Sequence, residues 1–204
     1  MQAEVSLNSA IPSVTIIIPA YNEEKRIGKV LKDIADHISK NNLNWNIIVS
    51  IDGNDGTEQI VKNMAKNYNF ISYDKSKVRG GKGWAIKRVV NRAEGKFTIL
   101  MDADGSISFY DVIKYLKFTG EYDVILFDRY HSKNSRIPFL RKIPSRGYNI
   151  LVRALFRIKV YDTQCGYQII RTELLKKAFN KITVTNGFYY VPLIYYLEHQ
   201  GAKI

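Results

Sequence analysis

The sequence predicts an α/β fold with a mainly parallel central sheet and helices on both faces. Short apolar runs rich in β-branched residues alternate with stretches of helical periodicity through the first 128 residues. The runs are apolar at consecutive positions, as in strands that are covered on both faces. Repeated strand–helix units favour parallel strands joined by crossover helices.

The first two strand–helix units are the clearest. Residues 14–19 read VTIIIP and form the first predicted strand, which a helix over residues 24–39 follows. The apolar residues of this helix recur on one side: Ile27, Val30, Leu31, Ile34 and Ile38. Residues 45–51 (WNIIVSI) form the second predicted strand, and residues 57–67 form the helix after it.

The alternation continues through three more predicted strands. The short apolar run at residues 70–73 precedes a predicted helix over residues 82–93. The run FTILM at residues 97–101 is the fourth strand. A helix over residues 109–118 and a strand over residues 124–127 complete the pattern.

A strongly basic segment follows the fifth predicted strand. Residues 129–160 contain nine Lys or Arg and no Asp or Glu. Residues 129–144 include two prolines and are predicted to form a loop, whereas residues 145–158 are predicted to form a helix. Three arginines share one face of this helix: Arg146, Arg153 and Arg157. The helix is either a core helix with a solvated basic side or an amphipathic element on an anionic membrane surface.

The composition restricts the class of partner. Lys and Arg number 31 and Asp and Glu number 19, so the net charge is +12 and an anionic partner is expected. The single cysteine, Cys165, excludes an internal disulfide, and three scattered histidines form no metal motif. No apolar run reaches the roughly 18 residues that span a bilayer, and no signal-peptide pattern opens the chain. We therefore expect a cytoplasmic protein that is soluble or peripheral to a membrane.

Acidic and glycine-rich residues follow the predicted strands, where ligands of open α/β sheets bind. Asp102 and Asp104 come directly after the fourth strand, and two carboxylates one residue apart can share a cation with a diphosphate. Residues 79–83 (RGGKG) can place N–H groups and a lysine near phosphate. Taken alone, each feature has a plainer interpretation, an acidic surface turn and a flexible loop.

Four stretches together resemble glycosyltransferase family 2 with the GT-A fold: VTIIIPAYNEE, the Asp52-Gly53 turn, GGKGWAIKRVVNRAEGKFTILMDADGS and DTQCGYQIIR. Within the family, the sequence is similar to the group of dolichyl-phosphate glucosyltransferases and dolichol-phosphate mannose synthases. The resemblance covers residues 13–204. It implies one domain with a GT-A (Rossmann-like) fold, in which residues 1–128 bind the nucleotide sugar and residues 129–204 bind the acceptor.

The resemblance also implies which residues form the site. The nucleotide sugar is expected to contact Pro19, Ala20, Tyr21, Glu23, Asp52, Lys82, Asp102 and Ala103. A cofactor, Mg²⁺ or Mn²⁺, is expected on Asp102 and Asp104. The expected catalytic residues are Asp104 and Asp162; Asp162 begins the segment that lines the sugar and acceptor side, and a structural hydrogen-bonding role stays open for it. The acceptor phosphate is expected to contact Arg129, Arg141 and Ser145.

The implied reaction moves glucose or mannose from UDP-glucose or GDP-mannose to a polyprenyl or dolichyl phosphate. It is expected at the cytoplasmic face of the cell membrane, with inversion at the anomeric carbon. An acceptor phosphate is already ionised at pH 7 and needs arginines rather than a base. A hydroxyl on a glycan or lipid stays open as the alternative acceptor, and it needs a carboxylate base, for which Asp162 is the nearby candidate.

The sequence departs from the family pattern in ways that bear on the substrate. Ile51 replaces the first of the paired aspartates after the second strand, which leaves uracil and guanine both open. Tyr190 and Pro192 stand where relatives carry the acidic residues of a Phe-Asp-Val-Glu run. The GKGxA and DTQCG stretches resemble the glucosyl branch of the family more closely, which implies UDP-glucose rather than GDP-mannose as the donor. A basic nucleic-acid-binding protein, the alternative of a different class, is disfavoured because no helix-turn-helix, RNP or zinc signature is present.

Overall fold

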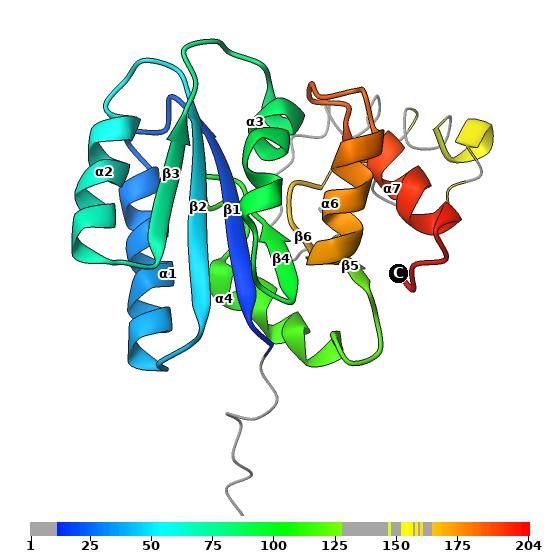
Figure 1. Cartoon of the computed structure of the whole chain (residues 1–204), viewed down its shortest axis with the longest axis horizontal. Coiled ribbons are helices and arrows are strands. Elements are labelled where there is room, and N and C mark those ends of the chain that lie inside the picture. Colours follow the sequence, from blue (N-terminus) through cyan, green and yellow to red (C-terminus); the bar gives the residue numbers. More distant parts are fainter. Residues whose placement is uncertain (1–11, 128–146, 148–151, 157, 159, 161–164) are drawn as a thin grey trace, which may run out of the picture.

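Strands form one sheet at the centre of the molecule, and helices flank it (Figure 1). The computed structural model describes residues 12–127, 147, 152–156, 158, 160 and 165–204. Within these residues the sheet has six strands in the order β3-β2-β1-β4-β6-β5. Their bounds are β1 (Val14–Tyr21), β2 (Trp45–Asp52), β3 (Ile71–Lys75), β4 (Phe97–Leu100), β5 (Val124–Leu126) and β6 (Gln168–Arg171).

The sheet is mainly parallel, which confirms the predicted fold class. β1 pairs in parallel with β2 and β4, and β3 pairs in parallel with β2. The apolar runs predict β1 to β5 but not β6, whose four residues include only two apolar ones. β6 runs antiparallel between β4 and β5 and pairs Gln168 with Leu100. The start of β6 therefore lies beside the end of β4.

The helices have the following bounds: α1 (Ile27–Lys40), α2 (Thr57–Asn67), α3 (Lys82–Val89), α4 (Phe109–Ile113), α6 (Thr172–Lys181) and α7 (Tyr190–His199). Two predicted helices end as 3₁₀ turns, since η2 (Val90–Arg92) follows α3 and η3 (Lys114–Phe118) follows α4. The predicted helix over residues 145–158 lies largely outside the described residues. Within it, residues 147 and 152–156 are described as helical. Among the described helices, none combines the length and apolar character that crossing a bilayer requires.

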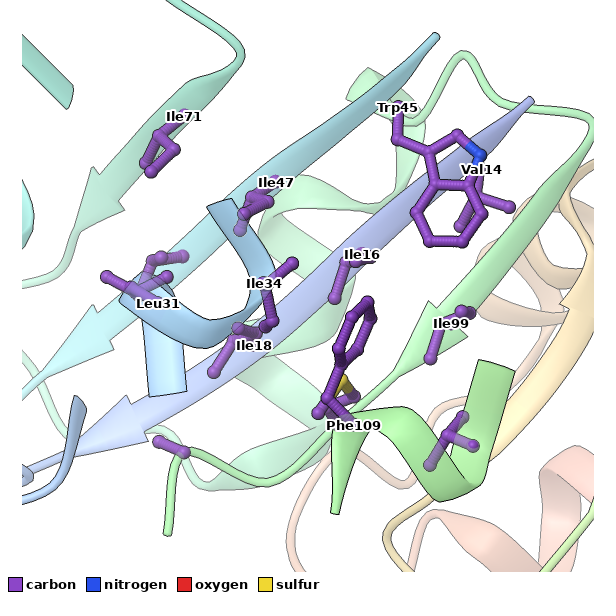
Figure 2. Packing of buried hydrophobic residues seen from close by; sticks show 14 of the residues in the cluster. Val14, Ile16, Ile18, Leu31, Ile34, Trp45, Ile47, Ile71, Ile99 and Phe109 are labelled. Atoms are coloured by element: carbon purple, nitrogen blue, oxygen red, sulfur yellow. The ribbon is translucent and has the colours of Figure 1, made fainter. Parts of the chain in front are cut away.

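Both faces of the sheet are buried, which explains the unbroken apolar runs of its central strands. Ile16 and Ile18 of β1 point to a core shared with α1, α2 and α4. Ile17 points to the opposite core, which α3, α6 and α7 cover. Figure 2 shows the first core, where Phe109 of α4 lies beside Ile16 and Ile99 on neighbouring strands. The helices thus hold the sheet from both sides and leave its strand ends free for a site.

Asp123, just before β5, joins three segments of the chain. Its Oδ1 accepts a hydrogen bond from Arg171 Nε at 2.7 Å, and its Oδ2 accepts one from the Lys203 N–H at 3.1 Å. The hydrogen bonds from Arg171 and the Lys203 N–H outweigh burial and lower the pKa of the Asp123 carboxyl. Asp123 therefore ties the start of β5 to the end of β6 and to residues beyond α7.

We expect Asp123→Ala to lower the free energy of unfolding by about 2 kcal/mol at pH 7, because two charge-assisted hydrogen bonds are lost. Since the folded-state pKa is lowered, this stabilisation is complete above the unfolded pKa of about 3.9. It decreases as the pH falls through the lower folded value. Urea unfolding at pH 7 and at about pH 3 measures the difference. Glu121→Ala, at an exposed position nearby, should change little, and an equal loss in both variants would contradict the assignment.

Candidate active site

The carboxyl ends of the parallel strands and the start of β6 meet at one edge of the sheet. The register pairs Tyr21 at the end of β1 with Asp52 at the end of β2. Asp102 follows the end of β4, and α3 begins at Lys82 after the crossover from β3. The structure thus brings together four of the residues that the sequence predicts for the nucleotide sugar, although they come from separate segments.

Asp102 forms an ion pair with Lys82. The Lys82 ammonium donates to Asp102 Oδ1, and the two side chains are 23% and 31% exposed, respectively. Burial disfavours the charge on Lys82, but Tyr190 and Asp102 outweigh burial and raise the pKa of the ammonium. The lysine is therefore charged at neutral pH, and the carboxylate beside it is already partly neutralised.

Gly166 lies directly against this ion pair. A Cβ at this position would come within 2.0 Å of Asp102 Oδ2 and 2.5 Å of Lys82 Nζ. Only glycine lets the backbone approach the pair this closely. On another side, the ring centroid of Tyr190 lies 5.3 Å from Lys82 Nζ. Residues from the second half of the chain thus enclose charges that belong to the first half.

Asp104 is exposed on the turn that follows β4. Its Oδ1 accepts a hydrogen bond from the Ser106 N–H at 2.9 Å. The buried Tyr167 holds the same turn, because its hydroxyl accepts a hydrogen bond from the Ile107 N–H at 3.2 Å. Burial, with the charges of Asp102 and Asp104, raises the pKa of Tyr167 to about 12. The phenol is neutral at physiological pH and lies within the field of both carboxylates.

The two carboxylates fit part of a site for Mg²⁺ or Mn²⁺. Carboxylate oxygens are the ligands that these cations prefer. Oδ1 of Asp102 is engaged by Lys82 and Oδ1 of Asp104 by Ser106, so the Oδ2 atoms of both carboxylates are the oxygens without a hydrogen bond from a described residue. The described part of the chain contains no group of three His, Cys, Asp or Glu placed to hold a metal ion. Other oxygens, such as those of a diphosphate and water, would have to complete the coordination.

A polar cavity of about 430 Å³ opens beside this edge, within the usual range for small-ligand pockets. Its lining comes from the loops after β1, β2 and β3: Tyr21, Asn22, Gly53, Asn54, Asp55, Lys77 and Arg79. The Arg79 guanidinium lies 3.9 Å from the ring centroid of the exposed Tyr21. An aromatic face and two cations suit a nucleobase and the phosphates attached to it.

Asp52 lies beside this cavity but is buried and fully engaged. Its Oδ1 accepts a hydrogen bond from Arg88 Nη1 at 2.7 Å, and its Oδ2 accepts one from the Gly80 N–H at 3.2 Å. Arg88 also donates from Nε to Asp74 Oδ2 at 2.8 Å and from Nη2 to Ser50 Oγ at 2.8 Å. In this arrangement Asp52 anchors the glycine loop, and a nucleobase contact stays a prediction.

The other residues of this edge that the sequence predicts to bind the nucleotide sugar contact neighbouring parts of the protein instead. The Glu23 N–H donates to Thr57 Oγ1 at 2.8 Å, and the Glu23 carboxylate pairs with Arg26 at 2.7 Å. Ala20 and Ala103 are buried, and Pro19 is half-buried. These residues shape the loop after β1 and the turn after β4. They are not among the residues that line the cavity.

The glycines of residues 80–83 allow a close approach between α3 and the loop before α7. A Cβ at Gly83 would lie 2.6 Å from the Thr185 carbonyl oxygen, which accepts the Trp84 N–H. This packing fixes the start of α3, and with it the position of Lys82.

The predicted residues Arg129, Arg141, Ser145 and Asp162 lie outside the described residues, and their roles stay predictions.

Comparison with known sequences assigns the family. The sequence model of glycosyl transferase family 2 matches residues 15–179. The chain belongs to glycosyltransferase family 2. A dolichyl-phosphate beta-glucosyltransferase, ALG5D, of Trichomonas vaginalis is 31% identical over 181 residues, which are 81% of this chain and 55% of the relative. The dolichyl-phosphate beta-glucosyltransferase of Dictyostelium discoideum is 29% identical over 94% of this chain and 64% of its own length. This family 2 chain thus spans about half to two thirds of these relatives.

Solved structures share the fold of this family 2 chain. A glucosyl-3-phosphoglycerate synthase of M. tuberculosis, crystallised with Mn²⁺, UDP-glucose and phosphoglyceric acid, has a TM-score of 0.65 and 18% identity, over 93% of this chain and 66% of its own. The mannosyltransferase PcManGT of Pyrobaculum calidifontis, crystallised with GDP-Man and Mn²⁺, has a TM-score of 0.57 and 19% identity, over 87% and 50%. The predicted GT-A fold is confirmed.

For three residues of the site the sequence does not indicate the contacts they make, although Arg88 and Gly166 lie within stretches that carry the family resemblance. Arg88 lies in an amphipathic helix and has the appearance of a solvated cation, and Gly166 follows the lone cysteine. Tyr190 is marked only as a departure from the acidic residue of relatives. The spacing of small residues around Lys82 was the one available indication that α3 approaches another backbone closely.

Proposed function

We propose that this chain is an inverting hexosyltransferase that moves a sugar from a nucleotide sugar to the phosphate of a polyprenyl lipid such as dolichyl phosphate. The observation that carries the proposal is the position of Asp102 and Asp104, which follow β4 at the edge where a polar cavity of nucleotide size opens. The names of the relatives support the acceptor class. The proposed division of labour keeps the donor on residues 1–128 and the acceptor on residues 129–204.

The proposed chemistry requires little proton transfer. Mg²⁺ or Mn²⁺ bound at Asp102 and Asp104 would stabilise the charge on the departing nucleoside diphosphate. Tyr21 and Arg79 would hold the base and phosphates of the donor. An ionised oxygen of the acceptor phosphate attacks the anomeric carbon from the face opposite the diphosphate, and the bond to the diphosphate breaks. The configuration at that carbon therefore inverts, and an α-linked donor gives a β-linked product.

The proposed donor is UDP-glucose, with GDP-mannose as the second candidate. Relatives named as glucosyltransferases favour glucose. A thermal-shift series with UDP, GDP, ADP and their sugars, each with and without Mn²⁺, tests the proposal. A nucleotide at a hundredfold excess over its Kd should stabilise the protein by about 2.7 kcal/mol. If no nucleotide raises the melting temperature, the proposed function is wrong. If GDP raises it and UDP does not, GDP-mannose replaces UDP-glucose as the proposed donor.

The acceptor is tested by radiolabelled sugar transfer to dolichyl phosphate and to dolichol. A phosphate acceptor needs cations and hydrogen-bond donors, which the proposal assigns to Arg129 and Arg141 and to the Ser145 hydroxyl, respectively. We expect Arg141→Ala to reduce transfer to dolichyl phosphate about a hundredfold, because one charge-assisted contact to phosphate is lost. The donor thermal shift should persist in this variant. Unreduced transfer in Arg141→Ala, or faster transfer to dolichol, would instead favour the hydroxyl acceptor.

We also propose that the chain docks peripherally on the cytoplasmic face of the membrane that contains its acceptor. The helical residues 152–156 expose Leu155 and Phe156, which are 68% and 45% accessible. They lie within the segment that has nine cations and no acidic residue. Exposed apolar side chains among cations suit an anionic bilayer surface.

Phe156→Glu should weaken sedimentation with phosphatidylserine vesicles about tenfold, because an apolar side chain that enters the headgroup region is replaced by an anion. Tyr110→Glu provides a matched control, since Tyr110 is exposed to the same degree on α4. Binding to purely zwitterionic vesicles should be weak for all variants. Equal losses for both substitutions would assign the effect to net charge and exclude this helix as the docking surface.

A further inference from the structure

The Lys82 ammonium pairs with Asp102, the carboxylate that the proposed function assigns to a divalent cation. The Lys82 ammonium donates to Asp102 Oδ1, and both side chains are largely shielded from solvent. Lys82 occupies one oxygen of the two-carboxylate site before any donor binds.

The surroundings of Lys82 fix the base of its side chain and place the ammonium beside Asp102. Gly83, the next residue of α3, is pressed against the Thr185 carbonyl, so the helix start has no room to shift. Gly166 closes the space beside Lys82 Nζ and Asp102 Oδ2, and the Tyr190 ring covers another side. The ion pair is therefore a built feature at the meeting point of α3, α7, the turn after β4 and the lead-in to β6.

An ammonium and a divalent cation compete for the same carboxylate. A cation that arrives alone meets an Asp102 whose charge is already offset, and it is repelled by Lys82 at short range. A nucleoside diphosphate brings anionic oxygens of its own, which give both the cation and Lys82 additional partners. The gain from each ligand therefore depends on the presence of the other, which is a coupling between two binding events.

We infer that Lys82 is a built-in counter-cation that blocks Asp102 in the nucleotide-free protein and passes to the donor diphosphate when cation and nucleotide bind together. The inference rests on the proposed function, since it takes the cation and the diphosphate as the two ligands. It makes Lys82 a positioning residue for donor loading. The site would then load its cation with the nucleotide and remain without it otherwise.

Manganese binding without nucleotide tests this inference directly. The EPR signal of free Mn²⁺ is titrated against the full chain and against Lys82→Met. We expect Lys82→Met to bind Mn²⁺ about tenfold more tightly than the unsubstituted protein, because Asp102 is released. Addition of UDP should tighten Mn²⁺ binding strongly in the unsubstituted protein and by about tenfold less in Lys82→Met.

Three variants control for charge and folding. Lys87→Met removes the same charge from the same helix, at a lysine that donates to the Ile182 carbonyl rather than to a carboxylate, and it should leave Mn²⁺ binding unchanged. Lys82→Arg keeps the charge and should keep the weak binding. Lys82→Met combined with Asp102→Asn should lose the gain. Circular dichroism and the melting temperature verify that each variant folds, and Lys82→Gln replaces the methionine variant if that one does not.

The outcomes separate this inference from the proposed function. If UDP or GDP stabilises the protein but Lys82→Met binds Mn²⁺ no more tightly than the unsubstituted chain, the inference is overturned and the proposed function stands. A gain in Lys82→Arg or Lys87→Met of the same size would also overturn it. If no nucleotide binds, the proposed function fails, and tighter Mn²⁺ binding by Lys82→Met would still support Lys82 as the residue that blocks Asp102.

Discussion

Arg88→Met is expected to lower the free energy of unfolding by about 3 kcal/mol, because it removes one partner from a buried ion pair. The Arg88 side chain is 14% exposed and that of Asp52 only 4%. Without the guanidinium, Asp52 keeps the Gly80 N–H but loses the charge that balances it, and Ser50 Oγ loses its donor. Urea unfolding monitored by circular dichroism at pH 7 measures the loss.

Arg92→Met is the matched control for this prediction. Arg92 lies in η2 and is exposed, and its guanidinium donates to Ser72 Oγ at 3.1 Å. We expect a loss below about 1 kcal/mol for this exposed contact. The double variant Arg88→Met with Asp52→Asn should be more stable than Arg88→Met alone, since it has no unpaired buried charge. A small loss in Arg88→Met, or a larger one in the double variant, would show that the ion pair does not stabilise the fold.

Asp104→Asn is expected to reduce sugar transfer by at least about a hundredfold, with the fold intact. An asparagine keeps the oxygen that accepts the Ser106 N–H but removes the negative charge with which Asp104 would hold the cation of the proposed metal site. The melting temperature without ligands should therefore change little. Initial rates of transfer from radiolabelled UDP-glucose to dolichyl phosphate, at saturating Mn²⁺, give the measurement.

Asp111→Asn serves as the control for Asp104→Asn. Asp111 is an exposed acid seven positions further on, at the start of α4, where it pairs with Lys114 at 2.7 Å. Its substitution also removes one negative charge but leaves the edge of the sheet unchanged, so transfer should stay within about twofold of the unsubstituted rate. Comparable rates in both variants would exclude Asp104 from the proposed metal site.

The sequence is sufficient to predict the strands that are covered on both faces. β1, β2 and β4 are apolar at consecutive positions because each contributes to two cores. This pattern can be recognised in the sequence before the fold is known. β6 has only Ile169 and Ile170 as apolar residues, and its place is set by pairing with β4 and β5, which are distant in sequence. Such long-range pairing leaves no local periodicity to read.

In the candidate site, too, residues that are close in sequence could be predicted and contacts between distant residues could not. Asp102 and Asp104 are one residue apart at a strand end, so their proximity is evident from the sequence itself. The contact between Lys82 and Asp102 joins the start of a helix to a turn 20 residues later, and that between Arg88 and Asp52 spans 36 residues. Both contacts depend on how α3 packs against the face of the sheet. Spacing along the chain therefore indicates the acids but not the cations that neutralise them.

The position of β6 has a consequence for the order in which the chain can fold. β5 has no direct partner among the first four strands, because β6 lies between it and β4. On a ribosome that releases the chain from its N-terminus, the edge of β4 stays open until residue 171 has emerged. An open strand edge invites pairing with other chains. The nascent protein is thus most exposed to aggregation while its basic middle segment is being made, and repulsion between the basic segments of different chains opposes such contacts.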